Sequence, residues 1–216
     1  ENPEERKSNQ EHEQEILDNF QKTVTRQPNG RYEVSMPWIQ GHKPLHDNLN
    51  LAKKRLDNLM NKLEKDGYYN EYDQVFQEWL KEGIIEEVND SEIGTSVHYL
   101  PHRHVVKLSS TTTKLRPVFD ASTREKDDLS LNHCLEKGIN LLTLIPSLLI
   151  NFRKSKIGVI SDIRKAFLQI SLHPSNRDFL KFLWYDKDKR LMVYRHIRVV
   201  FGVTCSPFLL KLSNIT

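Results

Sequence analysis

Asp162 is the residue whose surroundings best suit chemistry on phosphate groups. It follows a short continuous apolar run, residues 157–160 (IGVI), which predicts a buried strand ending just before the aspartate. Residues 151–216 carry thirteen Lys/Arg and four Asp/Glu, so the carboxylate lies in a basic segment. Carboxylates in such positions hold the divalent ions that bind transferring phosphates, which makes Asp162 a candidate Mg²⁺ ligand. An ion pair with Arg164 or Lys165 is the alternative.

Other reactive side chains form no convincing site. The histidines of residues 98–104 have no partner at the spacing of a zinc site, because Cys134 is distant in the sequence. His42 and His46 are four residues apart, and no third ligand accompanies them. The sequence also lacks a phosphate-binding loop, a nucleophile elbow and a dinucleotide fingerprint. The chemistry predicted from local pattern therefore centres on Asp162.

Charge is distributed unevenly along the chain. Residues 1–30 carry four Lys/Arg and seven Asp/Glu, and residues 31–150 carry fifteen and eighteen. The last third therefore has a net charge of +9, although the whole chain has only +3. A basic surface of this kind is expected of a protein that faces phosphates, and a solvated face without a partner is the alternative. Residues 1–19 also lack apolar periodicity and predict a polar tail.

Composition excludes several classes of protein. The mean hydropathy of the 216 residues is -0.60, and Pro146 and polar residues interrupt the richest apolar stretch, residues 141–150, so no membrane-spanning helix is predicted. The polar N-terminus argues against a secretory signal, and two distant cysteines exclude a disulfide framework, so we expect a reducing compartment. Glu1 in place of Met, and the end at Thr216, lead us to expect cuts within a longer protein.

The elements around Asp162 are predicted to be a hairpin and two helices. Two apolar runs that alternate with polar residues, 179–185 and 191–197, flank a polar turn and predict a β-hairpin. Residues 141–152 predict a helix with Pro146 in its first turn, where a missing N–H costs little. Residues 207–212 predict the start of another helix.

The N-terminal half predicts helices between short strands. Apolar residues recur every three or four positions over 45–63 and predict a helix bounded by Pro44 and Gly67. A second helix is expected over 71–81, with Asn70 as its N-cap. Short β-forming runs predict strands at residues 31–36, 84–88, 97–108 and 114–120. Helices with a mainly antiparallel sheet indicate an α+β fold.

Several groups of residues resemble the reverse transcriptases. Residues 161–167 (SDIRKAF) look like their first catalytic motif, in which an aspartate ends a palm strand and an aromatic residue follows five positions later. Residues 201–208 (FGVTCSPF) resemble the next motif, and residues 114–122 (KLRPVFDAS) resemble the fingers hairpin. The resemblance covers residues 31–216. It is most specific to the BEL/Pao class of long-terminal-repeat retrotransposons, through the phrases at 32–38, 83–86, 118–122, 130–132, 177–178, 182–184 and 201–204.

The resemblance implies roles at a catalytic centre. Asp162 would bind two catalytic Mg²⁺ ions, and the carbonyl of Ile163 would help to hold them. Phe167 would lie beneath the sugar of the incoming nucleotide and exclude a 2′-hydroxyl sterically. Arg116 would hold the triphosphate, since a planar guanidinium makes bidentate contacts with phosphate. Lys114 would make a weaker phosphate contact.

The other residues that the resemblance implies would shape the nucleotide site. Asp120 would sit near the triphosphate and template in a structural role. Gly202, Ser206 and Pro207 would form the loop and helix that hold the template and nucleotide. Phe201 stands where many retroviral enzymes have glutamine, so a polar contact to the nucleotide is absent. Taken singly, Gly202 and Pro207 are also ordinary turn residues, and Phe167 is an ordinary core residue.

The resemblance further implies fingers and a C-terminally truncated palm. The expected organisation is a polar linker or tail (1–30), an N-terminal and fingers region (31–130) and a partial palm (131–216). The Tyr-x-Asp-Asp hairpin of the family does not occur after Pro207, and the acidic residues elsewhere have the wrong neighbours. Because two-metal phosphoryl transfer needs several carboxylates, this chain is expected to be inactive alone.

The reaction implied for the parent enzyme is Mg²⁺-dependent, template-directed addition of deoxynucleotides to a primer 3′-OH. The implied partners are an RNA or DNA template–primer, deoxynucleoside triphosphates and the remainder of the Pol polyprotein, without a membrane; the oligomeric state is not predicted. The implied location is the cytoplasm, in retroelement particles, or the nucleus, and not the secretory route. A non-catalytic remnant that binds nucleic acid or protein is the alternative, and a truncated gene product without function is a third.

Overall fold

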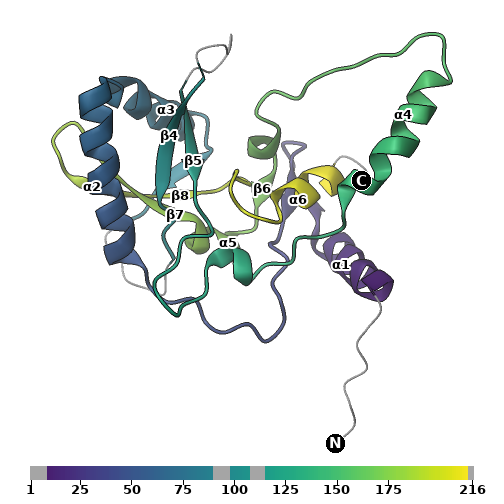
Figure 1. Ribbon diagram of the computed structural model, residues 1–216, viewed down its shortest axis with the longest axis horizontal. Helices are drawn as coiled ribbons and strands as arrows, with labels where there is room; N and C mark the ends of the chain where they lie inside the picture. Colours follow the sequence, from purple (N-terminus) through teal and green to yellow (C-terminus); the bar gives the residue numbers. More distant parts are fainter. Residues whose placement is uncertain (1–8, 90–97, 108–114, 214–216) are drawn as a thin grey trace, which may run out of the picture.

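Small sheets and helices form a mixed α+β structure in the computed structural model, which describes residues 9–89, 98–107 and 115–213 (Figure 1). This agrees with the α+β class predicted from the sequence. One sheet has the strand order β1 (Thr25–Arg26), β2 (Tyr32–Val34) and β6 (Ser171–Leu172). Here β1 and β2 are antiparallel, whereas β2 and β6 run parallel.

Two antiparallel hairpins confirm the strands predicted at 114–120, 179–185 and 191–197 and, over a shorter span, the strand predicted at 97–108. A second sheet has the order β3 (Ile85–Glu87), β8 (Leu191–His196) and β7 (Lys181–Tyr185). The strands β7 and β8 are joined by the predicted polar turn, and Phe182 pairs with Tyr194. The second hairpin pairs β4 (His102–Val106) with β5 (Leu115–Phe119), and its connecting residues lie outside the described part of the chain.

The helices α2 (Leu49–Asp66) and α3 (Tyr69–Lys81) follow each other almost directly. Gly67 ends α2 in the left-handed conformation with φ 74°, as predicted from its position. The helix α2 starts later than the predicted residue 45, because the side chain of Asn48 binds the backbone of Tyr99. Its amide oxygen accepts the Tyr99 N–H at 2.7 Å, and its amide nitrogen donates to the Tyr99 carbonyl at 2.8 Å. Asn70 is not an N-cap, because α3 begins at Tyr69, one residue before it. The turn at Gly67 that ends α2 leads directly into this start.

Aromatic side chains form the core between α3 and the two hairpins. Phe76 of α3 packs against Phe182 and Trp184 of β7, with ring centroids 5.1 Å away in each case. Trp184 is fully buried, and its indole N–H donates to the buried carboxylate of Asp73 at 3.0 Å. The core therefore joins a helix from the first half of the chain to strands from the last fifth.

Residues predicted to be a polar tail contain a helix instead. The helix α1 spans Asn9–Thr23 and buries Ile16 and Phe20, which are four residues apart on one face. Phe20 packs edge-on against Phe208 of α6 (Ser206–Ser213) with a centroid distance of 5.9 Å. The prediction was wrong because this short apolar face finds its partner at the other end of the chain. The first eight residues lie outside the described part.

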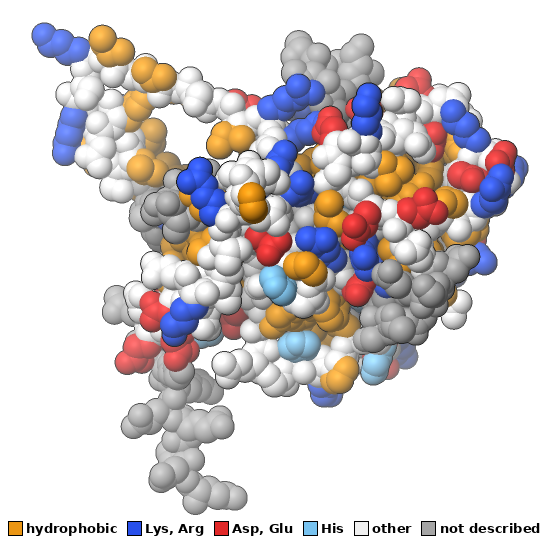
Figure 2. Space-filling model, turned by 180° about the vertical axis from the view of Figure 1, so that it is seen from behind, with side chains coloured by type: hydrophobic (Ala, Val, Ile, Leu, Met, Phe, Trp, Pro, Cys, Tyr) orange, Lys and Arg blue, Asp and Glu red, His pale blue; other side chains and the backbone are white. Residues whose placement is uncertain are grey.

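The helix α4 (Ile145–Arg153) projects from the rest of the molecule as an arm (Figure 1). It follows a 3₁₀ turn (Leu141–Leu144) and has Pro146 in its first turn, as predicted. None of its residues is buried, and apolar and basic side chains lie next to one another on the arm (Figure 2). No helix within the described residues is long and apolar enough to cross a membrane.

Candidate functional site

Asn132 joins the residues just after β5 to the loop of residues 201–204, which lies about 70 residues further along the chain than Asn132 itself. Its backbone N–H donates to the carbonyl of Ala121 at 3.0 Å, just beyond the end of β5. Its side-chain amide donates to Ser122 Oγ at 2.8 Å and to the carbonyl of Gly202 at 3.1 Å. Its amide oxygen accepts the Thr204 N–H at 2.8 Å. One side chain thus fixes the loop of residues 201–204 against the end of the β4–β5 hairpin.

We call the place where Asn132 holds the loop of residues 201–204 against the end of β5 the junction. The backbone conformation of Gly202 and its contact with β5 both require a glycine there. Its φ of 100° lies in the region that favours glycine, and a Cβ built there would overlap the carbonyl oxygen of Phe119. The close backbone approach brings the loop onto the last residue of β5. Gly202 therefore shapes this loop, as expected from the sequence.

Phe201 and Phe167 meet beside the junction. Their ring centroids are 4.2 Å apart at an interplanar angle of 68°, an edge-to-face contact. Phe201 is 64% exposed, whereas Phe167 is half-buried in the 3₁₀ helix η4 (Ala166–Gln169). Two residues that the sequence assigned to a nucleotide site thus form one aromatic surface that is open to solvent.

Asp162 lies on an exposed extended segment and does not end a strand. The predicted strand at 157–160 is not formed: Ile157, Val159 and Ile160 are 82%, 82% and 86% exposed. Among the described strands none pairs with this segment, and an extended chain without a ladder partner stays solvated. The ion pair with Lys165 does not form either, because Lys165 Nζ lies 2.7 Å from Glu82 Oε2 at the end of α3.

The described residues do not by themselves make a site for two Mg²⁺ ions. The donors predicted from the sequence are the Asp162 carboxylate and the Ile163 carbonyl, a single charged ligand. Within residues 9–89, 98–107 and 115–213 no group of three or more His, Cys, Asp or Glu side chains is arranged to hold a metal ion. Two-ion sites need several carboxylates, and within the described residues Asp162 has no second carboxylate arranged with it for this purpose.

The other predicted nucleotide contacts divide between exposed and structural positions. Arg116 is exposed on β5 and Lys114 lies outside the described residues. Asp120 stabilises the turn after β5, since its Oδ1 accepts the Ser122 N–H at 3.1 Å. Ser206 is buried and donates from Oγ to the Val200 carbonyl at 2.7 Å, so it holds the start of α6. Pro207 is exposed in the first turn of that helix.

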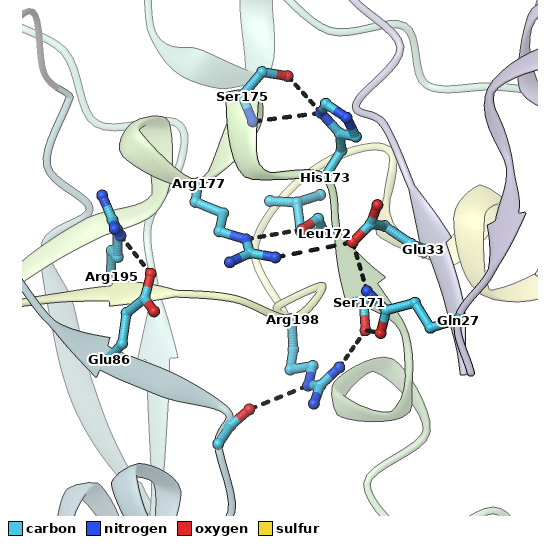
Figure 3. A network of polar contacts seen from close by, with 11 residues as sticks. Gln27, Glu33, Glu86, Ser171, Leu172, His173, Ser175, Arg177, Arg195 and Arg198 are labelled. Carbon is cyan, nitrogen blue, oxygen red and sulfur yellow. Dashed lines mark hydrogen bonds and ion pairs between the residues drawn. The ribbon is translucent and has the colours of Figure 1, made fainter. Parts of the chain in front are cut away.

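A network of arginines ties β6 to β2 and to the end of α3 (Figure 3). Arg198 donates to the Gly83 carbonyl at 3.2 Å and to Ser171 Oγ, and Arg177 donates to the Leu172 carbonyl at 2.9 Å. Burial lowers the pKa of Arg198, and the positive charges of Arg31 and Arg177 lower it further. The local sequence predicted neither this network nor Asn132, because their partners lie far along the chain.

Arg195 forms a separate ion-pair cluster on β8. Its guanidinium lies 2.6 Å from Glu86 on β3 (Figure 3). It also lies 2.9 Å from Asp178. Burial alone would lower the pKa of Arg195, but hydrogen bonds to both carboxylates outweigh it and raise the pKa. For Asp178, burial raises the pKa, and the hydrogen bonds from Arg195 and Lys181 outweigh that effect and lower it. These charges are neutralised within the fold.

Comparison with models of known protein families finds no match for this chain, and comparison with curated proteins finds none either.

Proposed function

We propose that this chain is the fingers region and first part of the palm of an RNA-directed DNA polymerase similar to the BEL/Pao class. The observation that carries the proposal is a convergence. Of the phrases on which the resemblance rests, those at residues 118–122 and 130–132 are close in the sequence, and the one at 201–204 lies about 70 residues further on; all three meet around Asn132.

The aromatic surface beside this junction supports the same proposal. Phe167 is the residue proposed to read the sugar, and it touches Phe201 at the edge of the loop that would hold the template and nucleotide. Arg116, the proposed triphosphate contact, is exposed on the strand that leads into the junction. An exposed aromatic ring offers a face on which a base can stack, and a guanidinium offers bidentate donors to phosphate, so both residue types suit a nucleotide.

The proposal includes a negative expectation for catalysis. Asp162 is one carboxylate on an exposed segment, and transfer of a nucleotidyl group needs more than one. Incubation of the 216-residue protein with an RNA template, a DNA primer, deoxynucleotides and Mg²⁺ should give no extension. Template-dependent extension that is lost in Asp162→Asn would show that the missing carboxylates are not needed, and would overturn this part of the proposal.

Binding of a template–primer tests the proposal itself. Fluorescence anisotropy with a labelled RNA–DNA duplex should show affinity that falls steeply with salt, because each neutralised phosphate adds about 0.9 to the slope of the logarithmic plot for a B-form duplex. Arg116→Ala should lower both affinity and slope, and Arg190→Ala, on the β7–β8 turn, is the control with the same change of charge. Equal binding by both variants would contradict a nucleic-acid surface at the junction.

A binding remnant without catalysis is the second candidate function. The net charge of +9 over residues 151–216 and the exposed, solitary position of Asp162 favour it. The transcript distinguishes the two, because the polymerase proposal requires a Tyr-x-Asp-Asp codon run downstream of the codon for Thr216. A stop codon at that point would favour the remnant.

A further inference from the structure

A pocket of about 390 Å³ lies between β2 and the residues that follow Asp162. This volume is in the range of small-molecule sites. Apolar side chains, from Ile163, Ile170 and Leu210, form part of its wall, and Arg31, Tyr32 and Gln169 line it as well. The pocket thus combines an apolar wall with one positive charge. Neither Arg116 nor the carboxylate of Asp162 lines it.

Arg31 is held in place at this pocket by Gln169. Its Nη1 donates to the side-chain oxygen of Gln169 at 2.8 Å and to the carbonyl of the same residue at 3.3 Å. Both of these hydrogen bonds to Gln169 use the same guanidinium nitrogen, Nη1. A guanidinium held along one edge can present its other donors to an anion in a fixed geometry.

Further arginines raise the positive potential around the pocket. Arg26 lies over the Tyr32 ring at 5.9 Å, and Arg198 and Arg177 lie over the neighbouring strand β6 (Figure 3). Arg31 and Arg198 donate to uncharged groups, and the carboxylate near Arg177 is Glu33, at 3.9 Å. Asp162 and Arg164, which flank Ile163 in the sequence, carry opposite charges. Positive charge at the pocket therefore exceeds negative charge, which favours an anionic ligand.

We propose that this pocket binds a phosphate group attached to an apolar or aromatic body, as in a nucleotide, with Arg31 as the phosphate contact. The apolar wall would receive the body of the ligand, and the guanidinium would pair with the phosphate oxygens. A free nucleotide and a nucleotide within a nucleic-acid strand share this chemistry. The site is separate from the one proposed at Asn132 and does not depend on a polymerase function.

Isothermal titration calorimetry on the full 216-residue protein tests this site. EDTA in the buffer removes divalent metal ions, so any binding that is measured does not depend on a metal. The probes are adenosine 5′-monophosphate, adenosine, inorganic phosphate and a short single-stranded oligodeoxynucleotide. The monophosphate should bind more tightly than adenosine or phosphate. Arg31→Ala should weaken its binding by about tenfold or more, because hydrogen bonds between two charged groups are among the stronger ones. A tighter oligonucleotide that also depends on Arg31 would assign the site to a nucleic-acid strand.

Matched variants separate binding from folding and from the proposed polymerase function. Arg190→Ala removes the same charge at the β7–β8 turn and should bind normally. Arg31→Ala should keep the thermal midpoint of the wild type, because Arg31 is only half-buried. Gln169→Ala should weaken binding less than Arg31→Ala. Equal affinity of wild type and Arg31→Ala for every probe, or no binding of any phosphate-bearing probe, would overturn the proposal.

Discussion

At the residue scale, the junction depends on the hydrogen bonds that the side chain of Asn132 makes with two loops. Asn132 is half-buried, and its amide serves three partners on two different loops. Its removal would leave the Gly202 carbonyl and the half-buried Thr204 N–H without this partner. The cost of such unsatisfied groups exceeds the net contribution of an average hydrogen bond.

Asn132→Ala should therefore lower the free energy of unfolding by about 1–3 kcal/mol. Urea denaturation followed by tryptophan fluorescence measures this change. Asn151→Ala is the control, because Asn151 is exposed on α4. If both variants unfold at the same urea concentration, Asn132 does not hold the two loops together.

Gly202→Ala should destabilise the protein more than the same change at Gly67. Both glycines have positive φ values, 100° and 74°, so each alanine is strained. Only at Gly202, however, would the methyl group also meet a backbone carbonyl, that of Phe119, whereas nothing lies within 4 Å at Gly67. We expect about 1 kcal/mol at Gly67 and at least about 2 kcal/mol at Gly202, measured by the same denaturation. Equal losses would contradict the close approach.

At the element scale, α4 and the segment after it show what happens to apolar residues without a packing partner. Leu148 and Leu149 are 62% and 52% exposed, and the residues expected to form a strand are still more exposed. A contiguous exposed apolar surface of this kind promotes association. Local pattern predicted the helix correctly, but it did not predict that no neighbouring element would cover it.

Replacing Leu148 and Leu149 together by glutamine should leave the free energy of unfolding within about 0.5 kcal/mol of the wild type, because no packing is lost. Dynamic light scattering should show less self-association. Leu209→Gln is the contrasting control, because Leu209 is 1% exposed in α6, and it should cost about 2 kcal/mol or more. A large loss of stability in the double variant would mean that α4 packs against the fold.

At the scale of the whole molecule, two buried histidines lie within the aromatic core that joins α3 to both hairpins. His196 packs edge-on against Phe119 at 4.5 Å, and neither of its ring nitrogens has a hydrogen-bond partner among the described residues. His102 interacts with the Tyr72 hydroxyl at 2.8 Å and donates from Nε2 to the Leu183 carbonyl at 2.9 Å. Burial lowers the pKa of His196 to about 3 and that of His102 to about 4.

These histidines should make the fold sensitive to acid. In the unfolded chain they bind protons below about pH 6.5, whereas in the folded protein they stay neutral down to about pH 3 to 4. Above pH 6.5 these histidines therefore do not reduce the free energy of unfolding. As the pH falls from 6.5 toward their pKa values in the folded protein, the free energy of unfolding decreases. At pH 4.5 each histidine should cost roughly 2–3 kcal/mol.

His196→Phe should reduce this loss between pH 7 and pH 4.5 by about 2 kcal/mol, because phenylalanine takes up no proton and suits an aromatic core. Thermal unfolding followed by circular dichroism at several pH values measures the difference. His133→Phe, at an exposed position, should keep the pH dependence of the wild type. Parallel curves for His196→Phe and the wild type would show that the acid sensitivity has another source.

The sequence by itself determined the elements whose causes are local. The helices α2 and α3 follow from apolar residues at helical spacing, and the β7–β8 hairpin follows from alternation around a polar turn. Gly67 likewise ends α2 in the left-handed conformation, as its position in the sequence predicted. Such features depend on neighbours within a few residues, so periodicity and turn chemistry suffice to predict them.

Only the tertiary structure decided which of these elements have partners. The helix α1 is stabilised by Phe208 near the other end of the chain, and residues 157–160 are not a strand because no described strand pairs with them. Asn132 and Arg31 became candidate site residues only when their contacts across 70 and 138 residues were known. Hydrogen bonds, buried faces and strand ladders each need a second group, and local sequence does not specify where that group will lie.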